Sequence, residues 1–145
     1  MSHARSRARR AAVQALYQWQ MTQQNVADIL KQFAEDYPDQ RVDRRYFDEL
    51  LRGVSSRLDE IDDAFTPLLD RPLKELDPVE LAVLRIATCE FITRLDVPYR
   101  VVINEAVESA RVFGAEQSHK YINGVLDKLS MRLRATEREA AAGKS

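Results

Sequence analysis

The sequence contains few of the residues that crosslink a chain, break it into turns or carry it into a membrane. Its 145 residues include one cysteine, four glycines and five prolines. The single cysteine, Cys89, excludes an internal disulfide and a multi-cysteine zinc site, and it is typical of a reducing cytoplasm. The scarcity of glycine and proline argues against the frequent turns of a β-sandwich or barrel. The longest aliphatic run, Leu81 to Leu84, is far shorter than the roughly 20 residues of a membrane span.

Residues that could support catalysis or hold a metal are also sparse. The four glycines match no phosphate-binding loop, and the two histidines, His3 and His119, are isolated from each other and from further ligands. Cys89 lies in an apolar segment, which favours a buried structural thiol over a nucleophile. The acidic cluster at residues 59–63 is better explained by a solvated helix face than by an acid/base pair. We therefore expect no catalytic residues, no metal and no cofactor.

What the sequence does have is a strong segregation of charge. The net charge is −1, but residues 1–27 carry four arginines and no acid, whereas residues 35–80 carry fourteen acids and seven bases. The balance turns positive again between residues 118 and 134. The chain is nearly neutral overall but basic near both ends, which indicates an anionic partner for those ends. A solvated, frayed N-terminus explains the four arginines about equally well.

Every segment with a clear hydrophobic period has the period of an α-helix. The first such segment is residues 4–22, and Asn25 can cap a second helix that ends at a turn over residues 37–39. Asp43 can cap a third stretch whose apolar stripe continues to Leu68. That stretch contains three candidate breaks, which are Gly53, Ser55-Ser56 and Pro67.

The best-defined helix start is at Asp77, which combines a capping carboxylate with Pro78 at the first helical position. Residues 78–94 are apolar around almost the whole circumference, which predicts a central helix packed on several sides. A further helix is predicted over residues 99–113, ending at Gly114. The last helix continues in phase through Asn123-Gly124, so we expect a helix there and no hairpin. Residues 136–145 contain no core residue and are expected to fray.

Nucleic-acid binding is the chemistry that the remaining polar residues suit best. Arginine donates paired hydrogen bonds to phosphate, and aromatic rings stack on unpaired bases. Tyr17 lies about two turns beyond Arg10, and the start of the last helix places an amide, a cation and a ring close together. For two of these residues the ordinary roles stay open: Tyr121 as a core residue with its hydroxyl at the rim, and Lys120 as a surface lysine. The residues at the start of the last helix are Gln117, Lys120, Tyr121 and Asn123.

Three segments together resemble the NusB family of transcription antitermination factors. They are ARSRARRAAVQALYQWQ at 4–20, ELDPVELAVLRIATCEF at 75–91 and DVPYRVVINEAVESARVFGAEQSHKYINGVLDKL at 96–129. The resemblance covers essentially the whole chain and implies an all-α fold of about seven helices in two small helical subdomains around a central apolar helix. We accordingly expect one RNA-binding domain over 1–135, with halves at about 1–70 and 76–135 and a frayed tail at 136–145.

The family's functional residues map onto this sequence through its motifs. Its lysine-aromatic RNA contact in the motif SHKFVNG falls on Lys120 and Tyr121, and the aspartate common before that motif is replaced by Gln117. A neutral amide there favours RNA binding because it removes a charge that repels phosphate. The resemblance also implies an interface with NusE, a ribosomal small-subunit protein, at Glu80 and Arg85. The implied RNA contacts near the N-terminus are Arg5, Arg7, Arg9, Arg10 and Tyr17.

We therefore expect a cytoplasmic, non-enzymatic adaptor that recognises the single-stranded boxA element of ribosomal RNA operon transcripts together with NusE. The resemblance places it in the RNA polymerase antitermination complex, where it supports full-length transcription. The alternative is a purely protein-binding helical scaffold without RNA specificity. A homodimer that covers the arginines is left open, and no membrane partner is expected.

Overall fold

The computed structural model describes residues 3–36 and 41–143, and all regular secondary structure within those ranges is helical. The predicted all-α fold is therefore confirmed, with eight α-helices in the described ranges. The helices are α1 (His3–Thr22), α2 (Val26–Asp36), α3 (Arg44–Ser56), α4 (Leu58–Phe65), the short 3-10 helices η1 (Thr66–Leu68) and η2 (Leu73–Glu75), α5 (Pro78–Thr93), α6 (Tyr99–Phe113), α7 (Ser118–Leu133) and α8 (Ala135–Gly143).

Helix α5 is the centre of the fold, as its apolar circumference predicts. It packs against α1, α3, α4, α6 and α7, and eleven of its residues are buried. The helix begins where the sequence indicates, because the Asp77 carboxylate accepts hydrogen bonds from the backbone N–H groups of Val79 and Glu80, each at 3.1 Å. These bonds satisfy two donors that would otherwise be orphaned at the helix start.

The other predicted helix boundaries also follow from local chemistry. Asn25 accepts a 2.8 Å bond from the N–H of Ala27, and Asp43 accepts a 3.0 Å bond from the N–H of Tyr46. The long third stretch divides after Ser56, so that its stripe is shared by α3, α4 and η1. The predicted turn at residues 37–39 lies outside the described residues. Residues 123–124 remain within α7, as the in-phase stripe predicts.

Glycine lets α3 approach α5 at one point of this core. A Cβ atom at Gly53 would lie 2.8 Å from the Sγ atom of Cys89. Burial raises the pKa of the Cys89 thiol to about 11, so the group stays protonated at neutral pH. The thiol therefore serves as a small apolar packing group between the two helices.

Residues 136–143, which belong to the segment expected to fray, form most of α8 (Ala135–Gly143). Arg134 explains why α8 is held. It is 4% exposed, and its guanidinium donates to the carbonyls of Phe91 at 3.0 Å and Arg94 at 2.9 Å, at the C-terminal end of α5. Glu137 on α8 pairs with Arg134 and also accepts a 2.9 Å bond from the backbone N–H of Tyr99. These charge-assisted bonds replace the apolar contacts that α8 lacks.

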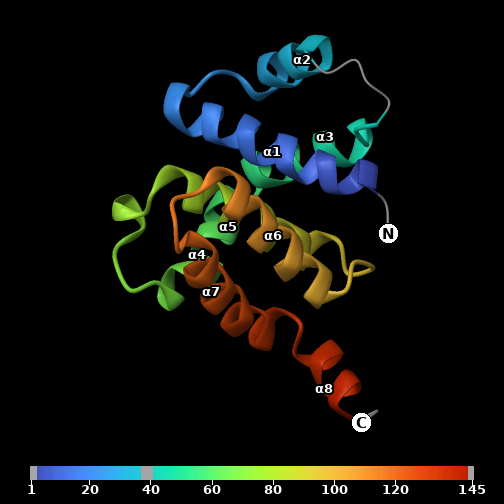
Figure 1. Ribbon diagram of the computed structural model, residues 1–145, viewed down its shortest axis with the longest axis vertical. Coiled ribbons are helices and arrows are strands. Elements are labelled where there is room, and N and C mark those ends of the chain that lie inside the picture. Colours follow the sequence, from blue (N-terminus) through green and yellow to red (C-terminus); the bar gives the residue numbers. More distant parts are fainter. Residues whose placement is uncertain (1–2, 37–40, 144–145) are drawn as a thin grey trace.

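Figure 1 shows how the helices are arranged. Helix α1 crosses the molecule above α5 and α6, with α2 on its outer side, while α7 leads away to α8 at the other end. The turn that joins α6 to α7 lies beneath the C-terminal part of α1. Among the described residues, none of the helices combines the length and apolar character that crossing a bilayer requires.

Candidate functional site

Helical phase divides the residues of α1 between the core and solvent. Ala8, Ala12 and Leu16 are fully buried. On the opposite side, positions i, i+3, i+7, i+10 and i+14 form a continuous line that we call the α1 stripe, because residues at these spacings share one helix face. The α1 stripe consists of Arg7, Arg10, Gln14, Tyr17 and Met21, all of them exposed or half-buried.

Arg9 does not belong to this stripe, which corrects the expectation that all four N-terminal arginines face RNA. Its side chain is 3% exposed, and Nε donates to the two carboxylate oxygens of Glu90 at 2.9 and 3.1 Å. Glu105 lies 3.6 Å from the same guanidinium. Tyr46 donates its hydroxyl to Glu90, and Ser6 donates to Glu105 at 2.6 Å. Arg9 is thus the centre of a buried polar network that joins α1, α3, α5 and α6.

Arg5 occupies an intermediate position between the network and solvent. Its guanidinium lies 4.3 Å from the centre of the Tyr46 ring, in cation–π geometry, and the side chain is half-buried. Burial and the Glu90 carboxylate both raise the pKa of the Tyr46 hydroxyl, so that the ring stays neutral beneath the cation. Arg5 is therefore held in place against α3, with part of its surface still open.

The N-terminal half of the α1 stripe lines a hollow of about 390 Å³ that we call the arginine hollow. Arg7 also donates a 3.3 Å bond to the carbonyl of Arg41. Among the described residues, no acidic side chain lines this hollow, and the buried Nε of Arg10 has no hydrogen-bond partner. The guanidinium groups of Arg7 and Arg10, with no acid among the described lining residues, form a site that attracts an anion. The lining residues are Arg7, Arg10, Ala11, Gln14, Arg41, Val42 and Phe113.

The C-terminal half of the stripe lines a second hollow of about 530 Å³, which we call the aromatic hollow. It shares Gln14 and Phe113 with the arginine hollow, so the two hollows adjoin along α1. Tyr17 is 40% exposed here, as a ring available for stacking must be. The lining residues are Val13, Gln14, Tyr17, Gln18, Met21, Thr22, Phe33, Val79 and Phe113.

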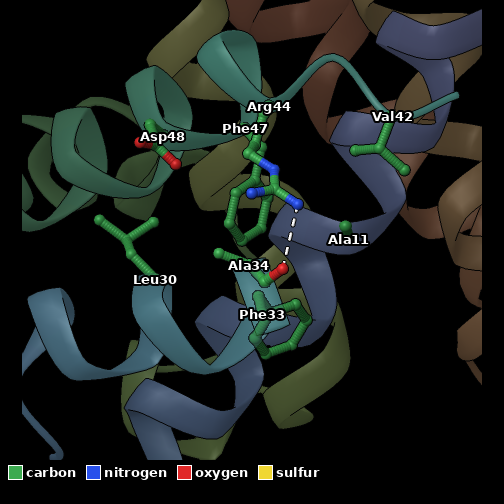
Figure 2. Close-up of a pocket in the computed structure, with 8 residues that line it drawn as sticks. All are labelled: Ala11, Leu30, Phe33, Ala34, Val42, Arg44, Phe47 and Asp48. Atoms are coloured by element: carbon green, nitrogen blue, oxygen red, sulfur yellow. Dashed lines mark hydrogen bonds between the residues drawn. The ribbon is translucent and has the colours of Figure 1, made fainter. Parts of the chain in front are cut away.

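A third gap, on the α2 and α3 side of α1, is too small to hold a ligand. It encloses about 20 Å³, which is room for one water molecule. Figure 2 shows the gap, with Arg44 donating a 3.0 Å bond to the carbonyl of Ala34. The rings of Phe33 and Phe47 stack with their centres 5.6 Å apart. This region is a packed seam that fixes α2 and α3 against α1, and the seam in turn supports the wall of the arginine hollow at Val42.

The predicted residues at the start of α7 follow Phe113 along the chain but line neither hollow. Lys120 and Gln117 are exposed, and Gln117 has a left-handed backbone with φ of 77°. A left-handed conformation is costly for a residue with a side chain, and here it forms the turn that leads into α7 at its N-cap. Gly114, which precedes it, is closely packed, since a Cβ atom there would lie 2.7 Å from the carbonyl oxygen of Ala110.

Tyr121 adopts the packing role that the sequence left open for it. Its hydroxyl lies 3.1 Å from the carboxylate of Asp70, and the Arg71 guanidinium lies 5.1 Å from the ring centre. The Arg71 side chain also lowers the pKa of Asp70, to which it donates two hydrogen bonds. Partial burial raises the pKa of the Tyr121 hydroxyl. The ring thus joins α7 to the segment before α5 and is not presented as a free stacking platform.

The two residues expected at a NusE interface, Glu80 and Arg85, are both largely buried. Glu80 is 9% exposed and Arg85 is 8% exposed. Arg85 donates two bonds to Asp62, at 2.8 and 2.9 Å, and one to Gln20 at 3.0 Å. These bonds tie α5 to α4 and α1. Other acids of α4 and of the segment that leads into α5 are exposed, namely Asp59, Glu60, Asp63, Glu75 and Asp77.

The described residues form neither a candidate metal site nor a reactive nucleophile. They hold no group of three or more histidine, cysteine or acidic side chains that could share a metal ion. The arrangement that remains is a surface of cations, amides and one exposed aromatic ring along α1.

Sequence reasoning predicted only Arg7, Arg10 and Tyr17 among the residues that line the two hollows, and it missed Gln14, Met21, Arg41 and Phe113, among others. The spacing of Gln14 and Met21 from Arg7 and Tyr17 was a usable signal, because all four lie on one helix face. No comparable signal existed for Arg41 and Phe113, which reach the site from outside α1 through the tertiary fold.

Comparison with known proteins places this geometry in a family. Residues 6–131 match the model of the NusB family. The transcription antitermination protein NusB of Pseudomonas entomophila is 55% identical over 136 residues, which cover 94% of this chain and 82% of that protein. That of Pseudomonas putida is 56% identical over 139 residues, covering 96% of this chain and 84% of that protein.

Solved structures of this family share the fold. A Thermotoga maritima NusB structure superimposes with a TM-score of 0.78 at 33% identity, covering 91% of this chain and 94% of that one. A crystal structure of NusB and NusE in complex with double-stranded RNA contains a chain that superimposes with a TM-score of 0.81 at 25% identity, covering 89% and 97% respectively.

Proposed function

Because the chain belongs to the NusB family, we propose that it is a transcription antitermination factor that binds RNA together with NusE. Its target in this proposal is the single-stranded boxA element of ribosomal RNA operon transcripts. Binding there supports full-length transcription of the operon by RNA polymerase. The protein acts as an adaptor, and it supplies binding surfaces and no catalytic groups.

The observation that carries the proposal is the arginine hollow. Arg7 and Arg10 project from one face of α1 into this hollow, and none of its described lining residues is acidic. A phosphate group would neutralise these cations and accept the hydrogen bond that the buried Nε of Arg10 does not make within the described chain. Guanidinium groups suit this role because they present paired donors to phosphate oxygens.

The rest of the RNA path follows the α1 stripe towards α7. Tyr17 offers an exposed ring on which an unpaired base can stack. Lys120 and Gln117 then contribute a cation and a neutral amide at the start of α7. Arg5 adds a fixed positive charge at the other end of the stripe. Arg9 and Tyr121 are left out of this interface, since their polar groups are bonded within the protein.

The exposed acids of α4 and of the segment before α5 form the proposed docking surface for NusE. A basic ribosomal protein is attracted by such a surface, and the attraction acts mainly on the rate of association. The buried pair Arg85 and Asp62 holds α4 against α5 beneath it, with a separation of 2.8 Å. Glu80 and Arg85 thus act as the framework of the interface and not as its contact residues.

The proposal is tested by comparing a boxA RNA with a scrambled RNA of equal length and composition, each with and without NusE. We expect the full-length protein to bind boxA RNA more tightly than the scrambled RNA, and NusE to increase that difference. Fluorescence anisotropy of labelled RNA measures both affinities. Equal affinity for the two RNAs in the presence of NusE would favour the protein-binding scaffold instead.

Affinity for boxA RNA is expected to fall steeply with salt. Four cations, Arg5, Arg7, Arg10 and Lys120, predict a slope of about −3 for the logarithm of the binding constant against the logarithm of the salt concentration, because each neutralised phosphate on a single strand contributes about −0.7. A titration of anisotropy across salt concentrations measures the slope. An affinity that does not change with salt would remove the electrostatic basis of the site.

A further inference from the structure

The outer face of α7 carries a line of exposed positions that continues beyond the proposed RNA contact at Lys120. Positions i, i+4, i+8 and i+11 share one helix face, and all four are exposed. On the opposite side of α7, Ile122, Leu126 and Leu129 are fully buried. We call the exposed line the α7 stripe, and none of its members is acidic. The α7 stripe consists of Lys120, Gly124, Lys128 and Met131.

Gly124, in the middle of the α7 stripe, is not explained by packing among the described residues. A Cβ atom there would meet nothing within 4 Å outside the backbone of its own helix. By contrast, a Cβ atom at Gly53 or Gly114 would collide with neighbouring atoms at 2.8 or 2.7 Å. Glycine destabilises a helix interior relative to alanine, so this position carries a cost without an internal reason. The bare backbone does allow another chain to approach α7 closely from outside.

The charges beside Gly124 indicate what kind of chain approaches it. Lys120 and Lys128 lie about one turn before and one turn after it, each about 6 Å away along the helix axis. Neither ammonium group forms a hydrogen bond or ion pair with any described residue. The one acid of α7, Asp127, accepts a 3.3 Å bond from Arg138 on α8, which offsets its charge. Two cations on either side of a bare backbone suit a strand of regularly spaced phosphates.

We propose that the α7 stripe binds RNA that flanks the boxA element, with the sugar-phosphate backbone crossing α7 at Gly124 and reaching Lys128. The inference rests on the proposed function and extends the RNA contact beyond boxA itself. RNA is indicated as the occupant by continuity, because Lys120 is both the last cation of the proposed boxA site and the first member of the α7 stripe. Figure 1 shows α7 leading away from α1 in this direction. Contacts to phosphate carry no sequence information, so the flanking bases are not read.

The test compares a minimal boxA RNA with the same RNA extended at its 5′ end or its 3′ end by a short run of uridines. Fluorescence anisotropy in the presence of NusE measures each affinity. We expect one of the two extensions to raise the affinity of wild type by up to about fivefold at low salt, the contribution of one exposed ion pair. The salt slope of that RNA should be steeper by about 0.7, because one further phosphate is neutralised.

Two variants separate the charge of the α7 stripe from its bare backbone. Lys128→Gln should remove the gain from the extension and leave the affinity for minimal boxA RNA unchanged. Gly124→Leu places a bulky side chain without hydrogen-bonding groups in the path of the RNA and should also remove the gain. The same variant should raise the Tm by about 2–3 °C, because leucine favours the helix. Lys31→Gln removes the same charge from an exposed site on α2 and, as the matched control, should keep the gain.

The outcomes distinguish this inference from the proposed function. If neither extension raises the affinity of wild type, or if Lys128→Gln keeps the gain, the α7 stripe does not bind flanking RNA and the proposed function stands. If Lys31→Gln loses the gain as well, the general field of the protein explains it and the inference is overturned. If Gly124→Leu raises the Tm but keeps the gain, the close approach at Gly124 is refuted. If wild type does not distinguish boxA from scrambled RNA, the proposed function fails, and this inference fails with it.

Discussion

Replacing Arg9 with methionine is expected to lower the free energy of unfolding by about 3–5 kcal/mol, because removal of one partner leaves buried charge without compensation. Glu90 is 1% exposed and Glu105 is 7% exposed, and both carboxylates face the Arg9 guanidinium. The hydroxyl groups of Tyr46 and Ser6 remain as partners, but neither supplies a positive charge. Urea denaturation followed by circular dichroism measures the change.

The neighbouring arginine provides the control for this prediction. Arg10→Gln removes the same charge one position further along α1, yet its guanidinium faces a hollow and forms no ion pair with any described residue. A change within about 0.5 kcal/mol is expected, which is typical of surface substitutions. Equal destabilisation by the two variants would contradict the division of α1 into a core face and the α1 stripe.

Replacing Arg7 and Arg10 together with glutamine is expected to weaken boxA binding by about 100-fold at low salt. Each charge-assisted hydrogen bond to an ionised group contributes about 1.5 kcal/mol or more, and two such losses correspond to roughly this factor. The fold should be unaffected, because both side chains lie on the outer face of α1. Anisotropy with labelled boxA RNA measures the affinity, and urea denaturation measures the stability in parallel.

The matched variant for this pair removes two positive charges elsewhere on the surface. Lys31 on α2 and Arg132 on α7 are both exposed, and neither lines the two hollows. Lys31→Gln combined with Arg132→Gln changes the net charge by the same amount and is expected to reduce affinity only a few-fold, through the general field of the protein. A loss as large as that of the Arg7 and Arg10 pair would mean that net charge alone governs binding.

Much of the fold could be predicted from the sequence because its signals are local. The caps at Asn25, Asp43 and Asp77 are short-range hydrogen bonds whose partners lie two or three residues away. The central position of α5 follows from its apolar circumference, and the resemblance to the NusB family supplied the arrangement of the helices. Helix α8 could not be predicted in this way, because it is held by Arg134 and its bonds to the end of α5.

The site was harder to predict because several of its residues are defined by partners far away in the chain. Arg9 and Glu90 are 81 positions apart, and Arg85 and Asp62 are 23 apart, so composition does not reveal that each is paired. Helical phase does separate the arginines of α1. Arg9 lies on the same helix face as the buried Ala12 and Leu16. Arg7 and Arg10 lie on the same face as Gln14 and Tyr17. The resemblance to the family assigned all four N-terminal arginines to RNA, and it did not separate the buried Arg9 from the others.

The most direct test of the account maps the RNA contact surface in solution. Amide chemical shifts of the isotope-labelled protein are followed by NMR as boxA RNA is added in the presence of NusE. We predict that the largest RNA-dependent changes fall on the α1 stripe from Arg7 to Tyr17 and on residues 117–120 at the start of α7, with α8 unaffected. Changes confined to only one of these two segments, or centred on α2 or α8, would contradict a single RNA surface built from α1 and α7.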